Sequence, residues 1–262
     1  MARPSALDES RSFKVRRIPW LRPLGWLARG AADLRRAPLP GLLHGLLAEG
    51  FGALVVAIAG DRFWLLAGAF SGFLLVAPVV ATGLYAVSRA LERGQRPSWR
   101  TVAVAWRPDN GRLVAFGLLL ALAGTGWVLT SAALVTGFAP APVRNPMDFL
   151  RIVVLSERSW LFEAWLVLGA VLAAPVFASS VVAIPLLLDR RVSVLAAVYP
   201  SWRTVLAHPP AMALWAALIL ALTLLGMATL LLGLIVVVPW LAHASWHAYR
   251  DLVDTTGLPE MP

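Results

Sequence analysis

Long apolar stretches alternate along this chain with short segments that carry its charges. A helix that crosses a bilayer needs roughly twenty mainly apolar residues. The pattern therefore predicts an all-α, polytopic membrane protein with six transmembrane helices, over about 42–59, 63–87, 113–138, 161–188, 210–227 and 231–250. We expect residues 20–254 to form this transmembrane domain, between a disordered basic cytoplasmic tail over 1–19 and a C-terminal cytoplasmic tail over 255–262.

The last two predicted helices come from one unusually long stretch. Residues 211–249 contain no Asp, Glu, Lys or Arg. A single helix of that length would reach about 58 Å, nearly twice the thickness of the hydrocarbon core. We therefore predict two short helices that turn near Gly226–Gly233, and a re-entrant segment is the alternative.

Composition agrees with a membrane protein. The chain has 262 residues, of which 59% are hydrophobic and 14% are charged, and its mean hydropathy is +0.75. An average soluble domain is about 45–50% apolar and about 25% charged, so this chain has too little polar surface to cover a soluble globule. The absence of cysteine excludes disulfides and thiolate metal sites.

Arginine and lysine predict the orientation, because these residues are enriched in cytoplasmic loops. With six spans, nineteen of them fall on the side of the two termini and four on the opposite side. We therefore place both termini in the cytoplasm and the protein in a bacterial cytoplasmic (inner) membrane. The basic excess points to the lipid bilayer as the partner and not to nucleic acid.

The sequence also contains an internal repeat. Pro97–Val102 recurs without change as Pro200–Val205, and Trp20–Arg36 is a looser copy. We interpret these as three parallel hairpin repeats, each preceded by a short cytoplasmic amphipathic helix; in the first, the apolar stripe is Leu24, Leu27, Ala31 and Leu34. Such a helix is either an interfacial anchor or a docking element. The repeat residues that we assign to the interface are Trp99, Arg100, Trp202 and Arg203.

Two kinds of residue could carry chemistry inside the bilayer. Glu49 lies about two turns into the first span, where an ionised carboxylate is costly and suggests a functional site; a solvated rim is the alternative. His243 and His247 share one helical face, and His44 could complete a metal or haem site with them. Hydrogen bonding to backbone, tyrosine or lipid phosphate is the alternative for these histidines, and we expect no cofactor.

Other polar motifs predict no catalysis. The chain has no phosphate-binding glycine loop, nucleophile elbow or pair of catalytic carboxylates, so we identify no catalytic residues. We interpret Asp189-Arg190-Arg191 as a solvated helix end. Prolines in the second helix of each hairpin predict kinks, which either form a cavity or serve packing; they are Pro78, Pro175, Pro185 and Pro239.

Three stretches resemble a bacterial family of integral membrane proteins, that of domain of unknown function 2189. They are Phe63–Tyr85, Pro185–Arg190 and Pro239–Val253, and the resemblance extends over about residues 20–254. Some members carry a cytochrome c oxidase subunit label. A haem–copper core would need about twelve spans and six deep histidines, so the resemblance implies at most an accessory role beside such an oxidase.

These observations favour a non-enzymatic accessory or structural membrane component, with a membrane-protein complex or a homo-oligomer as its assembly. A small-solute or ion transporter or channel that uses Glu49 and kinked helices is one alternative. A haem- or metal-binding redox protein that uses His44, His243 and His247 is the other.

Overall fold

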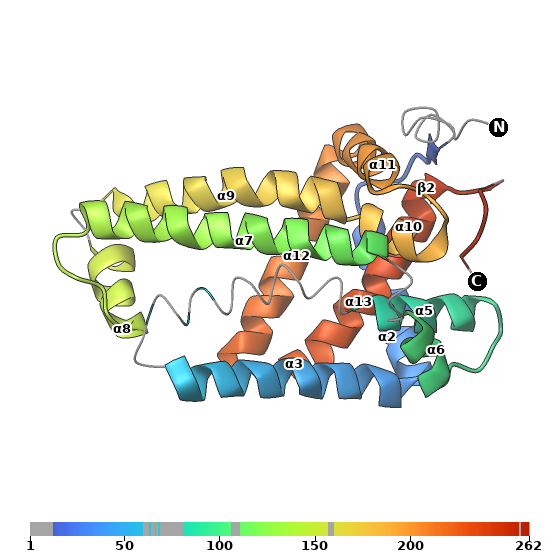
Figure 1. Cartoon of the computed structure of the whole chain (residues 1–262), viewed down its shortest axis with the longest axis horizontal. Helices are drawn as coiled ribbons and strands as arrows, with labels where there is room; N and C mark the ends of the chain where they lie inside the picture. The colour runs from blue at the N-terminus through green and yellow to red at the C-terminus, as the bar shows by residue number, and fades with distance from the viewer. Residues whose placement is uncertain are drawn as a thin grey trace. The chain divides into compact units, whose positions relative to one another are not determined.

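The computed structural model of the chain describes residues 13–59, 63, 66, 68, 81–105, 111–156, 160–256 and 258–261. These residues are mostly helical, which confirms the all-α prediction (Figure 1). In chain order the elements are β1 (Lys14–Val15), α2 (Arg22–Arg36), α3 (Pro38–Ala59), α5 (Thr82–Glu92), α6 (Trp99–Ala105), α7 (Gly111–Phe138), α8 (Pro146–Asp148), the π-helix η1 (Phe149–Val154), α9 (Leu161–Ser180), α10 (Ala183–Asp189), α11 (Val194–Ala207), α12 (Pro209–Ala228), α13 (Leu234–Leu252) and β2 (Val253–Asp254).

The chain divides into two compact units. The first consists of Met1–Glu49, Pro78–Phe116 and Phe177–Pro262, and the second consists of Gly50–Ala77 and Gly117–Val176. The second unit has an apolar core formed by Val135, Val143, Val153 and Leu161. Within this unit Trp165 Nε1 donates a hydrogen bond of 2.6 Å to Ser131 Oγ, which satisfies the indole nitrogen in apolar surroundings.

Among the described residues, four helical segments are long and apolar enough to cross a membrane: Pro38–Ile58, Gly111–Phe138, Leu161–Asp189 and Pro209–Ala228. They lie where the first, third, fourth and fifth spans are predicted, as a polytopic membrane protein requires. The second predicted span, 63–87, falls largely outside the described residues. The sixth, 231–250, is helical as α13 but is not among the four segments. Six spans and three repeats therefore remain predictions.

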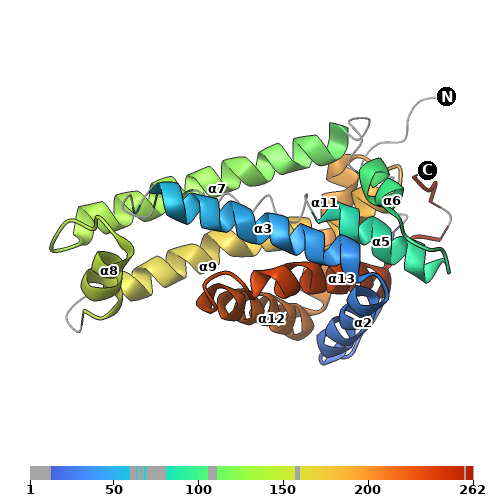
Figure 2. The ribbon, with the colours of Figure 1, turned by 90° about the horizontal axis from the view of Figure 1, so that it is seen from below.

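The predicted turn within 211–249 is confirmed. Helix α12 ends at Ala228 and α13 begins at Leu234. Leu230 and Leu231 adopt positive φ angles of 55° and 71°, and Figure 2 shows α12 and α13 side by side. The close return needs glycine, because a Cβ on Gly233 would lie 2.8 Å from the backbone Cα of Gly226.

The fourth predicted span is broken between α9 and α10. The ring of Pro185 clashes with a continuous helix at the carbonyl four residues earlier, and the helix is interrupted at Val181–Val182. The freed N–H of Val182 donates 3.1 Å to Ser201 Oγ of α11. A serine of the repeated motif therefore satisfies the backbone at the break.

The two copies of the repeated motif have different local structures. In the first copy, Pro97 and Ser98 precede the helix and α6 begins at Trp99, whereas the whole second copy, Pro200–Val205, lies inside α11. Ser201 is fully buried and Ser98 is exposed. Identical residues thus begin one helix and form the interior of another.

Part of the segment predicted to be a disordered tail has a defined structure, from residue 13 onward. Lys14–Val15 forms β1, which pairs antiparallel with Val253–Asp254 of β2. Disorder over the whole of 1–19 is therefore wrong for residues 13–19, because this strand pair ties the segment to the end of α13. Residues 258–261 are also bound: Arg191 N donates 3.0 Å to the carbonyl of Pro259, and Met261 N donates 2.9 Å to that of Asp189.

The buried face of α2 differs from the predicted stripe. Its buried residues are Pro23, Trp26, Leu27, Gly30 and Asp33. Leu24, which belongs to the predicted stripe, is half exposed at 49%. The helix is rotated because Gly30 permits contact with α13, as described next, and because Asp33 finds polar partners on the neighbouring helices.

Candidate functional site

Helix α13 is packed unusually closely by α2 and α3 in the first unit. A Cβ on Gly30 of α2 would lie 2.7 Å from Ala244 N, and a Cβ on Gly45 of α3 would lie 2.0 Å from the carbonyl oxygen of Ile235. Only glycine permits these backbone approaches. The polar side chains on this part of α13 are consequently removed from solvent.

Four polar side chains from three helices form a hydrogen-bonded cluster, which we call the Asp33 network: Asp33 of α2, Ser88 of α5, and His243 and His247 of α13. Ser88 Oγ donates 2.7 Å to Asp33 Oδ2 and lies 2.8 Å from His243 Nδ1. His247 Nε2 lies 2.8 Å from the same Oδ2. Asp33 is 4% exposed, and Ser88 and His243 are fully buried.

The Asp33 carboxyl is held in its ionised form. Burial raises its pKa, but the hydrogen bonds from His247 and Ser88 lower it further than burial raises it, so the pKa of Asp33 lies below its usual value. The carboxylate therefore accepts from both partners. Since the single hydroxyl proton of Ser88 is directed at Asp33, His243 donates from Nδ1 to Ser88 Oγ.

This order of groups differs from that of a nucleophilic triad. In a triad, histidine stands between the carboxylate and the serine and removes the serine proton. Here Ser88 stands between Asp33 and His243 and donates to the carboxylate. The Ser88 hydroxyl is thus an internal bridge between Asp33 and His243.

A second cluster surrounds Asp189, at the end of α10. Tyr249 of α13 donates 2.7 Å to Asp189 Oδ2, and Arg190 Nε lies 3.0 Å from that oxygen. Arg89 of α5 lies 3.9 Å from Oδ1, and Glu260 lies 3.2 Å from Arg190 Nη1. Asp189 is 2% exposed, so its interpretation as a solvated helix end is wrong.

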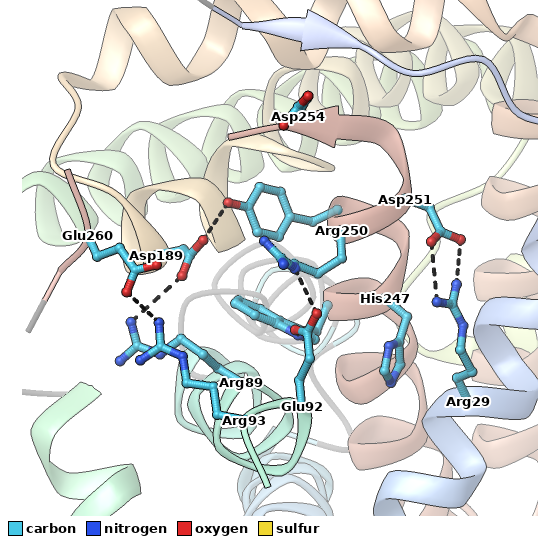
Figure 3. Close-up of polar contacts among 12 residues, drawn as sticks. Arg29, Arg89, Glu92, Arg93, Asp189, His247, Arg250, Asp251, Asp254 and Glu260 are labelled. Carbon is cyan, nitrogen blue, oxygen red and sulfur yellow. Dashed lines mark hydrogen bonds and ion pairs between the residues drawn. The ribbon is translucent and has the colours of Figure 1, made fainter. Parts of the chain in front are cut away.

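Charged pairs continue along α13 (Figure 3). Asp251 Oδ2 is bound by Arg22 Nε at 2.6 Å, by Trp26 Nε1 at 2.8 Å and by Arg29. Burial raises the pKa of Asp251, whereas the hydrogen bonds from Arg22, Arg29 and Trp26 lower it, and the pKa is lowered overall. These contacts join both ends of the described chain.

The α5 side of α13 has a matching pair. Glu92 of α5 accepts from Trp246 Nε1 at 3.1 Å and from Arg250 Nε at 3.1 Å. One carboxylate thus holds two residues of α13 that lie one turn apart.

The structure does not bring the three predicted metal-binding histidines together as one ligand set. His247 Nε2 binds Asp33, and His44 Nδ1 lies 2.8 Å from the carbonyl of Pro40. Among the described residues, no group of three or more His, Cys, Asp and Glu could hold a metal ion. His44 and His243 are both buried on facing helices, since a Cβ on Gly41 would lie 3.8 Å from His243 Nε2.

Glu49 lies apart from both clusters. It is half-buried on α3, at the boundary of the first unit. Within the described part of the chain it has no hydrogen bond or ion pair. Its role in transport therefore remains a prediction. The interfacial residues Trp99 and Trp202 are exposed at 46% and 37%, and Trp202 Nε1 donates 2.9 Å to Ser179 Oγ.

Sequence reasoning missed Asp33, Ser88 and Tyr249 as site residues. Asp33 belongs to a basic segment. An isolated acidic residue there, seven positions after Trp26, is the sequence feature that could have identified it as a site residue. Tyr249 lies at the end of the sixth predicted span. Neither position in the sequence reveals partners that come from distant parts of the chain.

Comparison with known proteins gives one match. Residues 65–189 match the model of a family described as "Predicted integral membrane protein (DUF2189)". No curated protein and no solved structure matches the chain. The match is shorter than the extent of 20–254 expected from the sequence, and the motif at Pro239–Val253 lies outside it. Over residues 65–189 the chain is similar to the family of predicted integral membrane proteins that share domain of unknown function 2189.

Proposed function

We propose that the chain is a non-enzymatic accessory or structural component of a bacterial inner membrane. One observation carries this proposal: the carboxylates around α13 are bound by cations, hydroxyls and indoles of the same chain. Asp189, Asp251 and Glu92 each accept from two or more internal donors. Groups that are saturated in this way hold helices together and are not offered to a substrate.

The orientation forms part of the proposal. Pairing of Lys14–Val15 with Val253–Asp254 supports placing the segments before α2 and after α13 on one side, as an even number of crossings requires. The predominance of arginine on that side supports a cytoplasmic location for it. Exposed Trp99 and Trp202 support short helices anchored in the headgroup layer.

The partner in this proposal is another membrane protein or a second copy of the chain. If the chain is an accessory subunit, a respiratory oxidase is the proposed partner. The test is purification of the tagged full-length protein in a mild detergent, followed by mass measurement of the complex. A defined partner or oligomer is expected. A protein that migrates as a single chain in every mild detergent and in lipid nanodiscs would contradict the proposal.

Membrane location and orientation are tested separately. The protein should remain in the pellet after alkaline carbonate extraction, and a reporter that is active only in the cytoplasm should be active at the C-terminus. An active reporter of export at that position would contradict the assigned side.

Transport is the second candidate, and the position of Glu49 supports it. A half-buried carboxylate on a candidate span is energetically costly, and residues of this kind usually mark a functional site. The test is a comparison of ion and solute flux into liposomes for Glu49→Gln and for the control Glu163→Gln, at the start of α9. Loss of flux only in the first variant would support transport, and equal flux in both would remove this candidate.

A further inference from the structure

The Asp33 network can do more than hold helices together, because each of its links is a short hydrogen bond along which a proton can move. Heavy-atom distances of 2.7–2.8 Å join His247 to Asp33, Ser88 to Asp33 and Ser88 to His243. Chains of aspartate and histidine within membrane proteins are typical of proton relays. We propose that Asp33 is a proton-binding site served from two sides, by His247 directly and by His243 through Ser88.

The two histidines differ in access. The side chain of His247 is 13% exposed and that of Asp33 is 5% exposed, whereas Ser88 and His243 are fully buried. The network thus leads inward from a ring that solvent reaches to one that it does not. The far nitrogen of His243, Nε2, has no hydrogen-bond partner within the described residues, and it faces α3 at Gly41.

The hydrogen bonds of Ser88 decide which ring nitrogen of His243 carries the proton, and they leave Nε2 as an acceptor on this inner side. Its Nδ1 donates to Ser88, because the only proton of Ser88 is directed at Asp33. The neutral ring then carries a lone pair on Nε2. A buried, unpartnered acceptor is costly, and a donor group would satisfy it. A proton bound there must be passed on, because burial disfavours the charged ring.

The transfer conserves every proton. A proton that binds His243 Nε2 makes the ring an imidazolium, whose Nδ1 proton passes to Ser88 Oγ while the Ser88 proton passes to Asp33 Oδ2. Ser88 remains a hydroxyl, His243 becomes neutral with its proton on Nε2, and Asp33 becomes a neutral acid. When His247 presents an unprotonated Nε2, Asp33 passes the proton to it, and Nδ1 of that ring releases one proton to water.

The charged side chains that face His243 belong to the Asp33 network or to α3, and the other charged groups nearby are paired in the clusters described above. His243 is influenced by Asp33 of α2, by His247 of its own helix and by His44 of α3. On α5, Arg89 faces Asp189 and Glu92 binds Arg250. Helix α12 contributes no ionisable side chain. This function does not depend on the accessory role, and either can fail alone.

The first test measures proton movement. The full-length protein is reconstituted in liposomes that contain a pH-sensitive dye, and a potassium gradient with valinomycin drives protons inward. Ser88→Ala should reduce flux on the order of tenfold or more, because positioned proton carriers contribute about 10²–10⁴ in rate. Ser245→Ala is the matched control, since Ser245 lies on α13 outside the Asp33 network: its hydroxyl donates to the carbonyl of Leu241 and contacts the side chain of Tyr85. Wild-type flux equal to that of empty liposomes, or equal flux in wild type and Ser88→Ala, would overturn the proposal.

The second test needs no variant, so that it stands even where Ser88→Ala fails to fold. Nitrogen-15 NMR of labelled histidine shows which ring nitrogen carries the proton. His243 should carry it on Nδ1 and His247 on Nε2, and both signals should change together with pH. A His243 ring that is protonated on Nε2 at every pH between about 5 and 8 would contradict the proposal.

Discussion

The hydroxyl of Tyr249 donates a 2.7 Å hydrogen bond to Oδ2 of Asp189, a residue 60 positions earlier in the chain. Both side chains are almost completely buried. The contact links α13 to α10 at the place where Pro185 breaks the fourth predicted span. The end of the broken segment is therefore fixed by the last helix of the chain.

Removing this hydroxyl should weaken the fold. We expect Tyr249→Phe to lower the free energy of unfolding by about 1–3 kcal/mol, because a buried carboxylate oxygen loses a donor. Thermal unfolding in detergent measures the change. Tyr199→Phe, at an exposed tyrosine of α11, is the control and should leave the transition within about 0.5 kcal/mol. Equal transitions for the two variants would contradict a stabilising role for the Tyr249 contact.

Close packing of α2 on α13 predicts a contrast between two identical substitutions. Gly30→Ala should destabilise the protein by about 1–3 kcal/mol, because its Cβ would meet Ala244 N at 2.7 Å. Gly25→Ala, on the same helix, has nothing within 4 Å of its Cβ and should be neutral or stabilising by up to about 1 kcal/mol. Unfolding of both variants in detergent is the measurement, and a stabilised Gly30→Ala would disprove the contact.

Stability should decline in acid through Asp251. The folded-state pKa of this carboxyl is lowered, because the hydrogen bonds from Arg22, Arg29 and Trp26 outweigh the effect of burial. Its stabilisation is therefore fully present above the unfolded pKa of about 4 and is lost as pH falls through the lower folded value. Unfolding midpoints recorded from neutral to acid pH should fall less steeply for Asp251→Asn than for wild type. Parallel curves would contradict this assignment.

The pairs of Glu260 should contribute little by comparison. Glu260 lies 2.7 Å from Arg93 and is half exposed, so solvent screens the interaction. We expect Glu260→Gln to change the free energy of unfolding by less than about 1 kcal/mol. Unfolding in detergent at two salt concentrations checks this, and a salt-independent loss above that value would show a stronger role for the C-terminal segment.

The positions of the helices could be predicted from the sequence wherever the chain is expected to lie in the lipid bilayer. A backbone in hydrocarbon must satisfy its own hydrogen bonds, so an uncharged run can be assigned as helix from composition alone. Helices α3, α7 and α12 accordingly begin within a few residues of their predicted starts. The turn after α12 was predictable because 39 uncharged residues exceed one bilayer thickness.

The candidate site was only partly accessible. The pairing of His243 and His247 on one face of a helix follows from their spacing, but their partner Asp33 lies 214 positions before His247. No local pattern relates such distant residues. The two copies of the repeated motif differ in structure for a similar reason: the Ser201 hydroxyl accepts from the N–H of Val182 at a break in another helix, and the identical Ser98 makes no such contact among the described residues.

Pairing of β1 with β2, together with the contacts of α2 on α13, has a consequence for biogenesis. Residues 14–15 are synthesised long before residues 253–254, with which they pair, and Trp26 is synthesised long before Asp251, to which it donates. Helix α2 must therefore wait, with Asp33 and Trp26 uncovered, until α13 has been made. A permuted chain in which α13 is synthesised directly before α2 would keep this closure and should assemble without that delay.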